Sequence, residues 1–119
     1  MRGPKFSMLE ADLIRLRHMV EAAQEALSFV QGKTRLDLNH DRKLVLSLMK
    51  DIEIVGEAAD KVTGQTRDRF PEIPWRDIKS MRNHLIHVYF DIDLDVLWDT
   101  ITKDLMPLVA QLERAVADD

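Results

Sequence analysis

Three residue types that could act on a phosphate group lie within six positions of one predicted helix. Arg82 carries a permanent positive charge, and its planar fork fits phosphate oxygens. His87 titrates near neutral pH, so it can take or give a proton. Asn83 lies one helical turn before His87 and could orient the imidazole or the phosphate. This set predicts a phosphate site with an acid–base group, although such a helix could equally hold a nucleotide without cutting it.

A packing role also fits the same spacing. At about 100° per residue, Arg82 falls within a stripe made by Ile78, Leu85, Ile86 and Tyr89. Such a stripe should face a core or a partner molecule, where an unpaired guanidinium is costly. The alternative is an amphipathic helix whose arginine head reaches solvent and whose histidine lies at the rim.

The wider sequence resembles the HepT-like branch of the HEPN ribonucleases. The pattern is Arg82, Asn83 directly after it, His87 after four residues, and then Tyr89. Further matching blocks cover residues 51–59 (DIEIVGEAA), 71–78 (PEIPWRDI) and 89–93 (YFDID), together with the Leu-Trp pair at 97–98. These blocks all lie within residues 51–98 of the 119-residue chain. No family role is carried onto His84, where the pattern tolerates varied residues.

The resemblance implies a metal-independent endoribonuclease without a cofactor. Arg82, Asn83 and His87 would form the catalytic site, and two such sites would face each other across a homodimer cleft. The ribose 2′-hydroxyl of RNA would be the attacking group. HepT-like proteins are toxins of type VII-like toxin–antitoxin pairs, encoded beside a minimal nucleotidyltransferase antitoxin. Tyr89 would accept AMP from that partner and thereby silence the nuclease, whereas on packing grounds alone Tyr89 is a half-buried aromatic at a helix end.

Two glutamates are expected to support Arg82. Glu53 and Glu57 are i,i+4 neighbours, and Gly56 between them permits another helix to approach closely. We expect one glutamate to pair with Arg82. No histidine or aspartate lies at ligand spacing beside them, so no metal site is predicted.

Length and composition favour one small soluble domain. The chain has 119 residues, enough for a single core, and the expectation is one HEPN-like domain over residues 1–119. Cysteine is absent, which excludes disulfides and thiolate metal sites. No leader or membrane-spanning run is recognised, so a cytoplasmic protein is expected. The net charge of −4 argues against an extended nucleic-acid-binding surface, while residues 67–87 are locally basic and residues 91–104 acidic.

Helical periodicity dominates the first half of the chain. Ser7 and Glu10 form a capping box for a helix that runs to about residue 30, with Gly32 as its stop. Asp37 or Asn39 is expected to cap a second helix that ends at residue 64. One apolar seam runs along this second helix: Leu44, Leu48, Ile52, Val55, Ala59 and Val62.

The second half predicts a loop over residues 65–73 and two further helices. Pro74 fits the first position of the third helix, which should run to Tyr89 or Phe90. Asp93 should cap the fourth helix, and Pro107 should kink or split it. No alternating strand pattern appears, so the fold class is all-α, an up-and-down bundle of four to five helices.

Two functions remain open from the sequence. The first is a ribonuclease toxin with an RNA substrate and a nucleotidyltransferase partner. The second is a non-catalytic subunit that presents a nucleotide or substrate to that transferase. The complete set of Arg82, Asn83, His87 and Tyr89 favours the enzyme.

Overall fold

The computed structural model describes residues 7–86 and 91–118 of the chain. Within these two ranges the chain is almost entirely helical and forms no β-strand. The elements in chain order are α1 (Glu10–Val30), α2 (Asp37–His40), α3 (Arg42–Asp60), α4 (Gly64–Arg69), α5 (Trp75–Leu85), α6 (Leu94–Asp99), the π-helical segment η1 (Thr100–Asp104) and α7 (Leu105–Ala117).

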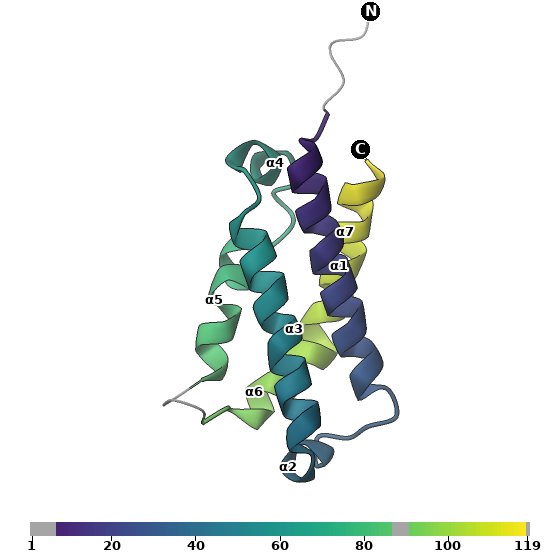
Figure 1. The fold of residues 1–119 in the computed structure, drawn as a ribbon, viewed down its shortest axis with the longest axis vertical. Coiled ribbons are helices and arrows are strands. Elements are labelled where there is room, and N and C mark those ends of the chain that lie inside the picture. Colours follow the sequence, from purple (N-terminus) through teal and green to yellow (C-terminus); the bar gives the residue numbers. More distant parts are fainter. Residues whose placement is uncertain (1–6, 87–90, 119) are drawn as a thin grey trace, which may run out of the picture.

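The long elements run alternately up and down, as Figure 1 shows. Helix α3 lies between α1 and α5, and the joined elements α6, η1 and α7 return along the other side of the bundle. The short helices α2 and α4 lie in the connections at opposite ends. The predicted all-α up-and-down bundle is therefore confirmed. None of the helices in the described ranges is long and apolar enough to cross a membrane.

The ends of the first two long helices differ in part from the sequence prediction. The stop at Gly32 is confirmed: its φ is +76°, and the amide of Lys33 donates to the Val30 carbonyl at 2.9 Å. The capping box at Ser7 is wrong, because α1 begins at Glu10 and its N-cap residue Leu9 makes no side-chain bond. Asp41 caps α3, since its Oδ1 accepts a hydrogen bond from the Leu44 amide at 3.0 Å.

Two further boundaries were predicted wrongly. Residues 37–40 form α2, so neither Asp37 nor Asn39 caps the long helix. Helix α3 ends at residue 60, and residues 64–69 form α4 in place of a loop. Helix α4 is tied to α1 by Asp12, which is 1% exposed. The Asp12 carboxylate accepts hydrogen bonds from the hydroxyls of Thr63 and Thr66, both at 2.6 Å, and from the Thr63 amide at 3.1 Å.

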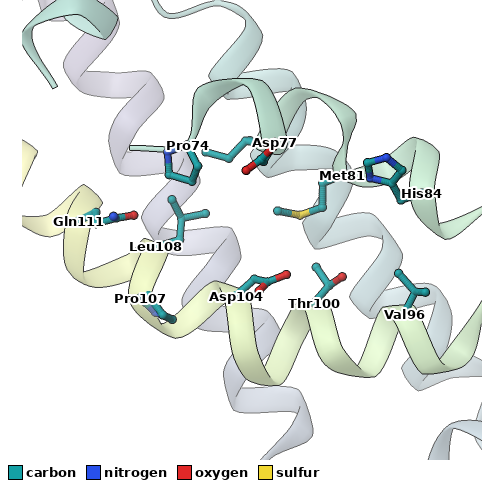
Figure 2. A pocket seen from close by; sticks show the side chains of 11 residues that line it. Pro74, Asp77, Met81, His84, Val96, Thr100, Asp104, Pro107, Leu108 and Gln111 are labelled. Carbon is teal, nitrogen blue, oxygen red and sulfur yellow. The ribbon is translucent and has the colours of Figure 1, made fainter. Parts of the chain in front are cut away.

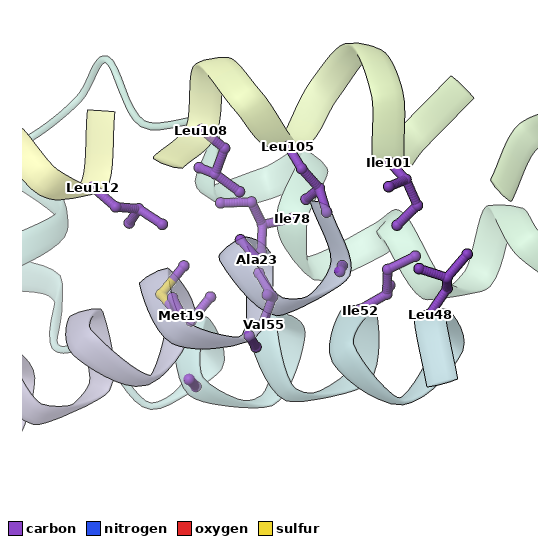
Figure 3. Packing of buried hydrophobic residues seen from close by; sticks show 14 of the residues in the cluster. Met19, Ala23, Leu48, Ile52, Val55, Ile78, Ile101, Leu105, Leu108 and Leu112 are labelled. Atoms are coloured by element: carbon purple, nitrogen blue, oxygen red, sulfur yellow. The ribbon is translucent and has the colours of Figure 1, made fainter. Parts of the chain in front are cut away.

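The core follows the predicted seam of α3. All six seam residues are buried, and Figure 3 shows Leu48 and Ile52 opposite Ile101 of η1. Ile78 of α5 lies beside Leu105 of α7 in the same cluster. Burying an aliphatic side chain of this size contributes about 1.5–3 kcal/mol. Helix α5 is therefore fixed to the bundle by an apolar edge.

The predicted disturbance near Pro107 is present as η1. Proline has no amide hydrogen, and its ring collides with the carbonyl four residues earlier, which here is that of Lys103. The chain widens into a π-helix over exactly that turn, where the Leu105 amide donates to the Thr100 carbonyl. Asp93 caps α6 as predicted, because its Oδ1 accepts from the Val96 amide at 3.1 Å.

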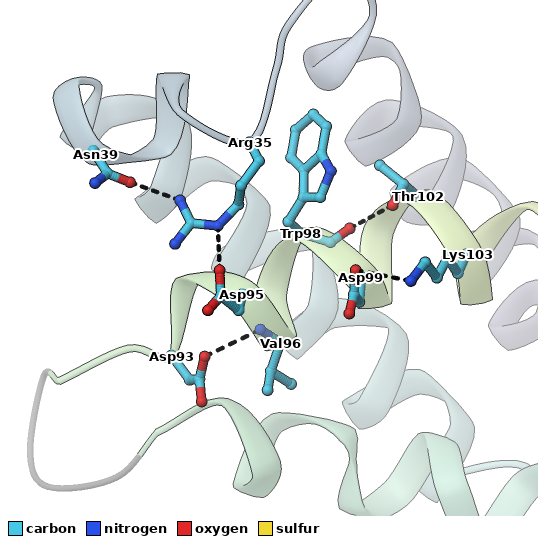
Figure 4. A network of polar contacts seen from close by, with 9 residues as sticks. All are labelled: Arg35, Asn39, Asp93, Asp95, Val96, Trp98, Asp99, Thr102 and Lys103. Carbon is cyan, nitrogen blue, oxygen red and sulfur yellow. Dashed lines mark hydrogen bonds and ion pairs between the residues drawn. The ribbon is translucent and has the colours of Figure 1, made fainter.

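A polar network ties α6 to the other end of the bundle (Figure 4). Arg35 donates from Nε to Asp95 at 2.7 Å and from Nη1 to Asn39 at 2.6 Å. Arg35 thus links the start of α6 to α2. Asp95 is exposed and the Arg35 side chain is partly exposed, so the ion pair orients the connection more than it stabilises the fold.

Candidate active site

Helix α5 has a groove on each side. The α3–α5 groove, of about 410 Å³, is lined by Ile52, Glu53, Gly56, Glu57, Asp60, Ile78, Lys79, Arg82 and Asn83. The α5–α7 groove, of about 530 Å³, is lined by Pro74, Asp77, Ile78, Met81, His84, Val96, Thr100, Asp104, Pro107, Leu108 and Gln111. Figure 2 shows the second groove, with Met81 and His84 on one side and Thr100 and Asp104 on the other. The predicted site residues on α5 belong to the first groove.

Arg82 and Asn83 stand side by side at the α3–α5 groove. Both are exposed, and both lie in the last turn of α5. Because the guanidinium of Arg82 is exposed, it stays hydrated in this chain. The free-energy cost that was predicted for burying it unpaired among apolar side chains therefore does not arise. The two side chains can therefore offer donors to a phosphate that enters the groove from solvent.

Two residues of the apolar stripe of α5, Ile78 and Leu85, are buried within the chain. Ile78 is 1% exposed and Leu85 is fully buried, both in the core of the bundle. Arg82 lies at the edge of this stripe and not under it. Of the two settings that the sequence left open for this stripe, a core or a partner molecule, Ile78 and Leu85 take the core of their own chain.

Gly56 sets the floor of the α3–α5 groove. A β-carbon at Gly56 would lie 3.7 Å from the backbone oxygen of Ile78, which is ordinary van der Waals contact. The expected close approach of two helices is therefore present. Without a side chain at this position, the groove stays open between the flanking glutamates.

Glu53 and Glu57 line the same groove as Arg82, as the spacing suggested. Within residues 7–86 and 91–118, however, no ion pair joins Arg82 to either glutamate. The ion pair found in this groove is between Lys79 and Asp60, at 3.6 Å, and both side chains are exposed. Pairing of Arg82 with a glutamate stays a prediction.

Two predicted site residues, His87 and Tyr89, lie outside the described residues. The helix that should have carried them ends early: α5 stops at Leu85, and Ile86 is extended with φ −110° and ψ 118°. Ile86 forms an isolated antiparallel bridge with Ile92, and the Asp93 amide donates to the Leu85 carbonyl at 2.7 Å. The prediction that α5 extends to residue 89 or 90 was therefore wrong. The helical spacing that was used to place His87 and Tyr89 relative to Arg82 applies only as far as Leu85.

The α5–α7 groove was not predicted as a site. His84 points to this side of α5, away from Arg82 and Asn83, because 200° separates positions 82 and 84 on a helix. Two carboxylates, Asp77 and Asp104, line the groove with apolar side chains such as Leu108. The sequence did contain an indication of this groove: Asp77 and His84 are spaced i,i+7, which puts both on one face of α5.

Neither groove contains a ready metal site. Within the described ranges, no three histidine, aspartate or glutamate side chains are placed so that they could hold a metal ion. Trp75, the first residue of α5, has a structural role: its Nε1 donates to the Phe70 carbonyl at 3.0 Å, and Arg67 lies over its ring at 6.0 Å.

Residues 19–115 match the family model described as "Ribonuclease HepT-like". The chain belongs to this HepT-like family. The match covers most of the chain and includes the whole of α3, α5 and both grooves. No solved structure matches the chain.

Curated relatives carry the same family name or a ribonuclease name. A Thermococcus cleftensis protein named "Probable ribonuclease HepT" is 34% identical over 99 residues, covering 80% of this chain and 90% of the relative. A Caldanaerobacter subterraneus protein named "Putative RNase" is 30% identical, covering 83% and 88%. A Methanocaldococcus jannaschii protein with that name is 28% identical, covering 82% and 90%. The HepT-like resemblance drawn from the motif blocks is thus confirmed.

Proposed function

We propose that this HepT-like protein is the toxin of a type VII-like toxin–antitoxin pair and cleaves RNA without a metal ion. The observation that most directly supports this proposal is the placement of Arg82 and Asn83, which are exposed side by side on an open groove. The family match and the ribonuclease names of the relatives support RNA as the substrate. The expected compartment is the cytoplasm.

The proposed reaction is transfer of the phosphorus from one ribose oxygen to another. His87 takes the proton of the 2′-hydroxyl as the new bond between that oxygen and phosphorus forms. The bond to the 5′-oxygen breaks, and that oxygen takes a proton from solvent. The products are a 2′,3′-cyclic phosphate and a 5′-hydroxyl. Arg82 stabilises the charge on the phosphate oxygens in the transition state, and Asn83 orients the imidazole or the phosphate.

The net charge of the groove limits the substrate it can hold. Lys79 and Arg82 face three carboxylates, those of Glu53, Glu57 and Asp60. Because affinity for a polyanion rises with the number of cations that contact it, one monomer offers a site for a single phosphate and no extended track. A homodimer that brings two grooves together would double the cations at the cleft, and we include this dimer in the proposal.

Cleavage by purified protein in EDTA tests the proposal. Arg82→Ala and His87→Ala should each lower the cleavage rate by about 100-fold or more. Arg76→Ala is the matched control, because Arg76 is an exposed arginine of α5 that lines neither groove. Equal activity in parent and Arg82→Ala, or a strict need for magnesium, would contradict the mechanism.

Two further measurements separate the alternatives. Growth arrest on expressing this chain alone would distinguish a toxin from the non-catalytic subunit of a nucleotidyltransferase complex. Light scattering should give a mass of two chains, whereas a lone 13.8 kDa species at micromolar concentration would remove the dimer cleft.

A further inference from the structure

The face of the bundle opposite the candidate active site contains a buried carboxylate that has no cationic partner among the described residues. Asp51 lies on α3 and is 2% exposed, and its Oδ2 has no hydrogen-bond partner. Buried carboxylates are normally bonded or paired, because desolvation of the charge is costly. Asp12, the other buried aspartate of this side of the bundle, meets the rule with three hydrogen bonds from threonines. The neighbour of Asp51 is instead another carboxyl group, that of Glu25, so Asp51 has no neutral or positive donor of the kind that Asp12 has.

Asp51 lies at the wall of a small pocket between α1 and α3. The pocket has a volume of about 200 Å³ and is lined by His18, Glu21, Ala22, Glu25, Asp51 and Ile54. Figure 1 shows α1 and α5 on opposite sides of α3, so this pocket is distinct from the α3–α5 groove. We call it the α1–α3 pocket.

The charge of the α1–α3 pocket is strongly negative. Three carboxylates, from Glu21, Glu25 and Asp51, face one imidazole, that of His18. Within the described ranges no ion pair reaches any of these carboxylates. No lysine or arginine of the described residues lines this pocket: Arg15 and Lys61 line an adjoining hollow, and Arg17 lines a neighbouring pocket that also includes Glu21. The pocket thus has carboxylate oxygens that can accept hydrogen bonds, but no lysine or arginine side chain that donates to them.

We propose that the α1–α3 pocket binds one organic cation, an alkylammonium or guanidinium group. Glu21 and Glu25 are exposed and make the direct contacts, while the buried Asp51 adds charge from the pocket wall. A bare metal ion fits less well, because no three acidic or imidazole groups of the described residues converge at metal distances. Ala22 and Ile54 supply apolar surface for an alkyl stem.

A proton competes with this cation. Burial and then the neighbouring Glu25 raise the pKa of Asp51 to about 7. At neutral pH and below, the carboxyl pair can hold a proton in place of a cation. The groups that face the pair are His18, Glu21 and Glu25 from α1, and Asp51 itself from α3. Binding should therefore strengthen as the pH rises through 7 and the proton leaves.

Titration calorimetry with two probes tests the pocket. Spermidine represents a free polyamine, and N-acetyl-arginine N-methylamide represents the arginine of a protein partner. We expect a dissociation constant on the order of 1 mM for at least one probe. The affinity should be about tenfold higher near pH 8 than near pH 6, since the fraction of deprotonated pair rises from about 1/11 to about 10/11. The probe that binds more tightly identifies the source of the cation.

Matched variants make the test decisive. Asp51→Asn and Glu25→Gln should each weaken binding and remove its pH dependence, whereas Glu10→Gln, an exposed acid elsewhere on α1, should not. Glu25→Gln serves if the buried substitution disturbs folding. Absence of binding of both probes up to about 20 mM near pH 8, a range that detects millimolar constants, would overturn the proposal. So would equal binding by parent and both pocket variants.

Discussion

The backbone oxygen of Ile78 lies 3.7 Å from the point that a β-carbon on Gly56 would occupy. This contact sets the distance between α3 and α5, and with it the width of the α3–α5 groove. A methyl group fits at ordinary contact distance, but a longer side chain would have to project into the groove beside Arg82. A substitution at Gly56 can therefore block access to the groove without preventing the chain from folding.

Substitutions at Gly56 should make that separation visible. Gly56→Ala should fold normally and gain up to about 1 kcal/mol, because alanine favours a helix interior over glycine. Gly56→Leu should fold as well, yet lose most RNA cleavage as its side chain fills the groove. Urea unfolding and a cleavage assay on the same samples measure the two effects. Full activity in Gly56→Leu would show that the substrate does not enter this groove.

The tyrosine that the family resemblance marks as an AMP acceptor can be tested by removing one oxygen. Tyr89→Phe should fold and cleave RNA, yet resist silencing when it is co-expressed with the cognate nucleotidyltransferase. Intact-mass spectrometry should find AMP on the parent chain and none at position 89 of the variant. If the transferase silences both proteins equally, inhibition works through complex formation without covalent transfer.

The Asp12 network should make stability depend on acid pH. Burial would raise the pKa of Asp12, but the hydrogen bonds from Thr63 and Thr66 and the charge of Arg67 lower it below the ordinary value. Its contribution is therefore present above about pH 4 and is lost as the pH falls through the lower folded-state pKa. Asp12→Asn should cost about 2–3 kcal/mol at neutral pH and less near pH 3. Urea unfolding at both pH values measures this, with the exposed Asp68→Asn as control.

Asp51 should make the protein less stable as the pH rises, which is opposite to the effect of Asp12. Its folded-state pKa of about 7 lies above the unfolded value, so its stabilising protonation is complete below about pH 4 and is lost as the pH rises through 7. The parent should lose stability as the pH rises from about 4 to about 7, and Asp51→Asn should flatten this profile. Near pH 8 the variant should be more stable than the parent. A parent profile that is flat over this range would contradict the raised pKa.

The sequence predicted the elements better than their ends. The seam of α3 was predicted because six apolar residues repeat at helical spacing, and local periodicity decides which face is buried. The end of α5 depends on Ile86 pairing with Ile92 across the chain, and no local pattern specifies that bridge. The cap of α3 was misplaced because residues 37–41 offer several capping side chains, of which Asp41 is the one used.

The candidate site was predicted in part. The sequence brought Arg82, Asn83, Glu53 and Glu57 together, and the structure places all four on one groove. Whether Arg82 faces the core or solvent depends on the rotation of α5 about its own axis where it packs against Gly56 of α3. That rotation is decided by the packing of the two helices and not by the local sequence. Asp51 was overlooked although its position gave a signal: it follows Leu48 by three residues and so falls on the buried side of α3.

The π-helical turn η1 holds one residue more than an α-helical turn would need between Leu97 and Leu105. Deleting a single residue from η1 would restore a regular α-helix with little rotation of α7 relative to α6, because the wider turn absorbs one residue without changing the direction of the side chains that follow. Leu108 and Leu112 would then stay in the core. A chain of this family that lacks the extra residue can therefore keep its α7 side chains, so single-residue gaps in alignments of the family should fall within η1 and leave the apolar pattern downstream in register.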